Sequence, residues 1–140
     1  MRTILCAVVS LGLLLTLGTT PVSAHHAFAS EFDSNKPVKF EGTVTKMMWV
    51  NPHAWIYVDV KKPDGTTEEW MVEAGTPNTL LRRGFTKASL LPGTRIRVDG
   101  YQSKDGSLRA NGRDLTLPDG RTLFLGASDT GAPPETPSKK

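Results

Sequence analysis

Cysteine is almost absent from this chain of 140 residues, because Cys6 is the only one and lies in the apolar N-terminal segment. Beyond that segment the chain has no thiol, which excludes an internal disulfide and a thiolate metal site there. A domain built from the later residues must therefore rest on its own apolar core, without a covalent cross-link.

Concentrated charge and long apolar runs are missing as well. The formal net charge is +3, and no run of basic residues is longer than two. A nucleic-acid-binding protein usually shows a concentrated basic patch, so we expect no nucleic-acid partner. The longest apolar stretch, Ile4 to Leu17, is shorter than the roughly 20 residues that a membrane-spanning helix needs.

The N-terminus has the pattern of a secretory signal instead. Arg2 provides the positive charge, the stretch from Ile4 to Leu17 the apolar region, and Val22-Ser23-Ala24 the small residues of a cleavage site. This pattern predicts a signal peptide over residues 1–24, cleaved after Ala24, and a periplasmic or secreted protein without a membrane anchor. An uncleaved anchor is the alternative. Cleavage would leave 116 residues (140 − 24) that begin at His25.

The rest of the chain is predicted to form one domain with a short lead-in and a tail. Residues 25–36 are a polar lead-in, in which Phe28 and Phe32 are the candidate anchors. Residues 37–126 form the domain. Residues 127–140 hold no large apolar residue and are rich in proline, serine and threonine, which is typical of a disordered tail.

Within the domain, apolar and polar residues alternate with the period of a strand. We expect six strands, over residues 38–50, 55–61, 68–73, 94–102, 107–117 and 121–125. The second and third are joined by Pro63-Asp64-Gly65, a tight-turn pattern. Between the third and fourth, residues 76–84 begin with Thr-Pro and end with Gly, which predicts a short helix.

The order β-β-β-α-β-β predicts an all-β protein, a small OB-fold-like barrel with one short helix. An SH3-like barrel or another small barrel is the alternative. Gly42 and Gly100 fall inside the expected strands, at positions where a barrel bends tightly.

Alternation also predicts an outer face rich in aromatic and thioether side chains. The face includes the rings of Trp49, Trp55 and Tyr57 and the thioethers of Met47 and Met71. OB-folds usually bind ligands on the outer side of these strands. A helix, the tail or the lead-in could instead cover the face. Lys46 breaks the inward series, so a bulge near it would shift the register.

The mature chain has three histidines, His25, His26 and His53. A terminal His25 would offer its α-amine and its imidazole to one metal ion, and His26 or His53 would add a further imidazole. Nitrogen ligands in a square arrangement suit Cu(II), and this set is similar to the histidine brace of secreted copper proteins. Cleavage one residue earlier would also leave a metal-competent terminus. A flexible, solvated His-His start is the alternative.

A second pattern concerns Cu(I). His53 lies between the first two expected strands, near Met47, Met71 and the tryptophans. Thioethers select Cu(I), and a tryptophan face can rest on a cation. In these residue types the chain resembles periplasmic copper and silver chaperones that are small OB barrels. The alternative is that His53 is only a turn residue after Asn-Pro.

The chain also resembles, over about residues 24–125, a family of small secreted bacterial proteins known only as a domain of unknown function. The matching stretches are Ala24 to Phe28, Glu31-Phe32-Asp33, Lys36-Pro37, Gly42-Thr43-Val44, Trp49 to Ala54, Leu80 to Gly84, Gly100-Tyr101 and Lys104 to Ser107. The resemblance implies no known activity. It implies that His25, His26 and the Asn51-Pro52-His53 turn belong to the shared pattern.

These observations favour a periplasmic domain that binds or transfers copper through His25, His26 and His53, with Met47 and Met71 as accessory ligands. The alternative is a domain that docks a protein, peptide or sugar on Trp49, Trp55 and Tyr57. We expect no enzyme, because the mature chain has no cysteine nucleophile and no Gly-x-Ser-x-Gly motif, and a small barrel offers little substrate cleft.

Overall fold

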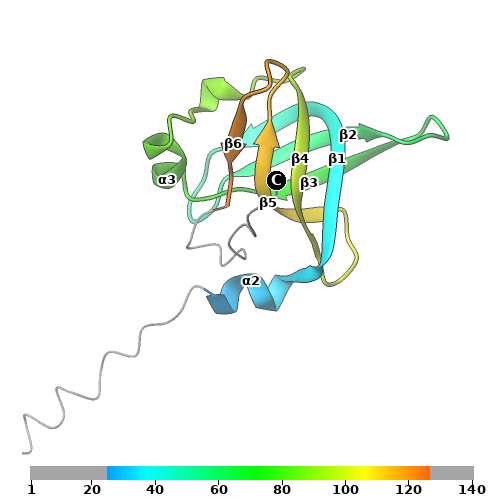
Figure 1. Cartoon of the computed structure of the whole chain (residues 1–140), viewed down its shortest axis with the longest axis horizontal. Helices are drawn as coiled ribbons and strands as arrows, with labels where there is room; N and C mark the ends of the chain where they lie inside the picture. The colour runs from blue at the N-terminus through cyan, green and yellow to red at the C-terminus, as the bar shows by residue number, and fades with distance from the viewer. Residues whose placement is uncertain (1–24, 127–140) are drawn as a thin grey trace, which may run out of the picture.

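A computed structural model describes residues 25–126, with side chains for residues 28–126 (Figure 1). The predicted signal peptide and tail lie outside the described residues. The elements, in chain order, are α2 (His25–Glu31), β1 (Phe32–Met48), β2 (Trp55–Lys61), β3 (Thr67–Glu73), α3 (Pro77–Arg82), the 3-10 turn η1 (Lys87–Ser89), β4 (Arg95–Ser103), β5 (Arg109–Thr116) and β6 (Thr122–Phe124).

The strands form a small barrel, as predicted. Strand β1 pairs antiparallel with both β2 and β4, β2 pairs with β3, and β4 pairs with β5. A parallel pairing of β3 with β5 closes the ring, and β6 adds to the free edge of β5. With α3 between β3 and β4, this connectivity is that of the OB-fold, so the expected all-β class is confirmed.

The lead-in is folded, and the strand that follows it begins earlier than expected. Residues 25–31 form helix α2, which lies outside the barrel where β1 begins (Figure 1). Strand β1 starts at Phe32, earlier than the expected Val38, and Phe32 pairs with Ser103 of β4. Phe28 and Phe32 are both buried. The burial of these two rings explains why a short polar segment is ordered, since a helix of this length is not stable alone.

Helix α3 forms where the Thr-Pro pattern predicts it. The Thr76 side chain accepts a hydrogen bond from the Thr79 backbone N–H at 3.2 Å, and Pro77 occupies the first turn. Gly84 follows the helix with φ +78°, a conformation that glycine adopts without strain. The helix contributes Leu80 to the core, and the segment after it contributes Phe85 and Leu90.

The barrel interior is filled by apolar side chains that alternate with outward-facing ones along the strands. It includes Val44, Ile56, Val58, Val72, Ile96, Val98 and Leu115. Trp70 is also buried and packs against Phe40, with ring centroids 4.7 Å apart. Because residues 25–126 contain no cysteine, burial of this apolar surface is the main stabilising contribution.

A bulge in β1 changes the outer face. The register shifts between Val44 and Lys46, so Met47 lies opposite Ile56 and packs on the core, whereas Met48 lies opposite Trp55. Trp49 also packs on the core, where its ring stacks on Phe85. The placement of Met47 and Trp49 on the outer face with Trp55 and Tyr57 is therefore wrong. One extra residue in the strand reverses the sides of those that follow.

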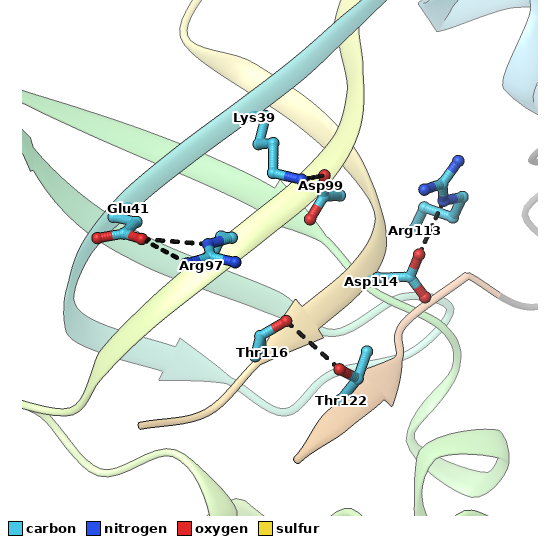
Figure 2. A network of polar contacts seen from close by, with 8 residues as sticks. All are labelled: Lys39, Glu41, Arg97, Asp99, Arg113, Asp114, Thr116 and Thr122. Atoms are coloured by element: carbon cyan, nitrogen blue, oxygen red, sulfur yellow. Dashed lines mark hydrogen bonds and ion pairs between the residues drawn. The ribbon is translucent and has the colours of Figure 1, made fainter. Parts of the chain in front are cut away.

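The outer side of β1, β4, β5 and β6 is polar, and its charges pair with one another (Figure 2). Lys39 lies 3.0 Å from Asp99, Arg97 lies 2.9 Å from Glu41, and Arg113 lies 2.8 Å from Asp114. Exposed ion pairs of this kind contribute only about 0–1 kcal/mol each. These neighbours neutralise one another, so this face presents no strong charge of one sign to a partner.

Gly42 lies where β1 approaches β2 closely. A Cβ at this position would lie 2.5 Å from both the Asp59 carbonyl oxygen and Val58 Cγ1. Gly42→Ala should therefore lower the free energy of unfolding by about 1–3 kcal/mol, since the facing backbone must move. Urea denaturation of the mature protein measures this. Ser34→Ala, at an exposed position of the same strand, should change it by less than about 0.5 kcal/mol; equal effects would contradict the close approach.

Candidate functional site

His53 lies in the connection between β1 and β2 and contacts a buried carboxylate. Its Nδ1 atom makes an ion-pair contact with Glu73 Oε1 at the end of β3. The His53 side chain is 20% exposed and that of Glu73 only 7%. One side of the imidazole is therefore held inside the protein, while part of the ring still faces solvent.

Glu73 belongs to a row of side chains on the outer side of the barrel. In the strand register, Trp55 of β2 lies opposite Glu73, Glu73 opposite Asn111 of β5, and Asn111 opposite Tyr101 of β4. Asn111 is 1% exposed, and its Oδ1 atom has no hydrogen-bond partner among the described residues. The Glu73 carboxyl and the Asn111 amide are thus buried neighbours, with Trp55 on one side and Tyr101 on the other.

Burial raises the pKa of the Glu73 carboxyl above its ordinary value. The nearby Glu31 carboxylate acts in the same direction, whereas His53 and Arg109 oppose it by favouring the ionised form. Desolvation is the largest of these effects. Four titratable groups from α2, β3, β5 and the β1–β2 connection therefore influence one another here.

Arg109, at the start of β5, links these groups. Its guanidinium lies 2.9 Å from the Glu31 carboxylate, 5.3 Å from the centre of the Trp55 ring and 5.9 Å from that of Phe32. A guanidinium stacks well on aromatic rings while its N–H groups bond a carboxylate. Arg109 therefore joins the end of α2 to the first residues of β1 and β2.

Helix α2 is held against the barrel by apolar and polar contacts. The Phe28 ring packs edge-on against Tyr101, with centroids 5.7 Å apart, and also against Phe32. The Lys104 backbone N–H donates to the Glu31 carbonyl at 2.9 Å, and its ammonium group donates to the Ala29 carbonyl. The lead-in is therefore fixed over the start of β1 and the end of β4, through Phe32, Tyr101 and Lys104.

The predicted site residues are only partly brought together. His25 and His26 lie in the first turn of α2, where the structure describes the backbone alone. Trp55, Tyr57 and Met71 are half-buried on the outer side, and the Tyr57 hydroxyl donates to Met48 Sδ at 3.3 Å. Met48 thus takes the outer position expected for Met47.

Glu31, Glu73, Arg109 and Asn111 were missed by sequence reasoning. The hairpin register gives a signal for Glu73, because it places that residue opposite Trp55. Arg109 and Asn111 gave no such signal, since they reach Glu73 through a pairing between strands far apart in the chain.

Within residues 25–126, neither a cluster of metal-ligating side chains nor a membrane-spanning helix occurs. No three histidine, cysteine, aspartate or glutamate side chains described there are gathered in a way that could hold a metal ion. No helix in the same range is long and apolar enough to span a membrane.

Glu73 gives the folded protein a pH dependence. Its pKa is raised above the ordinary 4.5 on folding, so its contribution to stability is present below pH 4.5 and is lost as the pH rises through the folded pKa. Glu73→Gln removes this ionisation. The stability of the variant relative to the wild type should therefore increase with pH across that window.

Urea denaturation of the metal-free mature protein, at pH values below and above 4.5, measures this difference. Thr67→Ala, at an exposed position of the same strand, is the control and should give a difference independent of pH. A difference for Glu73→Gln that falls with rising pH would contradict the assignment.

Comparison with known proteins adds a family but no activity. No curated protein matches the chain. The model of a family of unknown function, DUF6152, matches residues 13–112. That range covers more than half of the sequence and includes His25, His26, His53, Glu73 and Arg109, so the chain belongs to this family of unknown function.

Proposed function

We propose that this protein is an exported domain that binds copper through His53 and the N-terminal histidines, His25 and His26. The observation that supports this most directly is the contact between His53 and the buried Glu73. A histidine that ligates a metal almost always donates its second ring N–H to a carboxylate, a backbone carbonyl or water. The His53–Glu73 pair has this arrangement.

The contact also selects the ligating atom. With Nδ1–H donated to Glu73, the lone pair of the neutral imidazole is on Nε2. The His53 side chain is 20% exposed, and the proposal requires Nε2 to be part of the exposed surface. Glu73 would hold the ring in one orientation and tautomer and increase its basicity toward the metal.

The terminal residues supply the remaining nitrogens in this proposal. If the signal peptide is removed after Ala24, His25 offers an α-amine with a reference pKa of about 7.7–8.0, together with its imidazole. Three nitrogens from His25 and His53, or four when His26 is included, suit Cu(II). Met71, on the outer side, is retained as an accessory thioether for Cu(I), whereas Met47 packs on the core.

Calorimetric titration of the mature protein with Cu(II) tests the proposal. The form with a native His25 terminus should bind one ion, and a form with one extra N-terminal residue should bind it much more weakly. His53→Ala should lower the affinity by about tenfold or more, and Glu73→Gln by about 10- to 100-fold, as for other groups that orient a ligand.

Thr67→Ala, at an exposed position at the other end of β3 from Glu73, is the control and should leave the affinity unchanged. Equal Cu(II) binding by the two N-terminal forms would show that the α-amine is not a ligand. An unchanged Cu(II) affinity in His53→Ala would show that His53 is not a copper ligand and would overturn the proposal.

A further inference from the structure

We infer that Arg109 is a positioning residue, which holds helix α2 and the histidines at its start beside the part of the barrel that bears His53. This inference rests on the proposed copper function. It assigns a role to a residue that is itself no metal ligand and that faces the site from a different strand.

The contacts of Arg109 join the two parts of the proposed site. Its ion pair is with Glu31, the last residue of α2. Its ring contacts are with Phe32, the next residue along the chain, and with Trp55, which lies two residues after His53.

The pairing of β3 with β5 places Arg109, and with it the end of α2, close to the His53–Glu73 pair. Arg109 lies opposite Met71, two residues before Glu73 on β3, and it pairs with Glu31, the last residue of α2. Glu73 in turn contacts His53. Helix α2 has seven residues, so its first and last Cα atoms are only about 9 Å apart at 1.5 Å per residue. The backbone of His25 is therefore fixed within a short distance of Glu31 as long as α2 remains docked.

Docking of α2 should increase the affinity for copper through effective concentration. In a released arm, His25 and His26 would bind a metal without His53, or would pay the full entropic cost of meeting it. With α2 held in place, His25 and His26 are already held on the barrel that bears His53. The ion pair alone is too exposed to do this, since its partners are 31% and 55% exposed. Its combination with two ring contacts makes the joint specific for arginine.

Arg109→Gln is the main variant for testing this role. We expect it to lower the Cu(II) affinity of the mature protein by about tenfold or more. The electron paramagnetic resonance spectrum of its copper complex should become that of His53→Ala, because His53 no longer joins the ligand set. In a His53→Ala background, Arg109→Gln should have no further effect. A merely structural role would change neither the spectrum nor this additivity.

The chain offers a matched control in Arg97→Gln. Arg97 pairs with Glu41 at 2.9 Å, the same distance as the Arg109–Glu31 pair, but this pair joins β4 to β1 and does not include α2. Arg97→Gln should leave the Cu(II) affinity and the electron paramagnetic resonance spectrum unchanged. The exchanged pair, Glu31→Arg with Arg109→Glu, restores the attraction and should recover part of the affinity, which also controls for a folding defect in Arg109→Gln.

Amide hydrogen exchange in the last turn of α2, measured without copper, should become faster in Arg109→Gln and stay unchanged in Arg97→Gln. Failure of the wild type to bind copper would overturn the proposed function and this inference together. Copper binding that depends on His53 but not on Arg109, or unchanged exchange in α2, would overturn the inference alone.

Discussion

The parallel pairing of β3 with β5 is the constraint on which the rest of the structure depends. This pairing alone closes the ring of strands β1 to β5, and it places Glu73 opposite Asn111 and Met71 opposite Arg109. Without it, the end of β3 would be an open edge in water, and Glu73 would have no arginine near it. Barrel closure therefore converts a hairpin end into a partly buried cluster of charged groups, to which α2 is then attached.

A buried carboxylate lowers stability unless neighbouring groups compensate for its lost hydration. For Glu73, His53 and Arg109 compensate in part, while Glu31 acts against them. The Oδ1 atom of Asn111 adds a buried acceptor without a partner among residues 28–126. Such costly groups gather at functional sites more often than elsewhere. They direct attention to this cluster more strongly than the half-buried rings of Trp55 and Tyr57 do.

The sequence predicted the features that depend only on neighbouring residues along the chain. The period of two identified the strands and the inward set around Ile56 and Val58, because strand side chains alternate whatever the partner strand is. Lys46 indicated a bulge, yet only the pairing with β2 shows that Met48, and not Met47, turns outward. Glu73 and Arg109 were missed because isolated charged residues resemble solvated surface, and the pairing that unites them leaves no mark in either segment.

The folding of the lead-in connects the two parts of the candidate site. Phe28 and Phe32 are only 6% and 2% exposed, and burying each ring contributes about 1.5–3 kcal/mol. This exceeds what a seven-residue helix supplies by itself. The segment that follows the predicted cleavage site is thus fixed by tertiary packing, so the helix that begins at His25 and the buried pair at His53 belong to one folded unit.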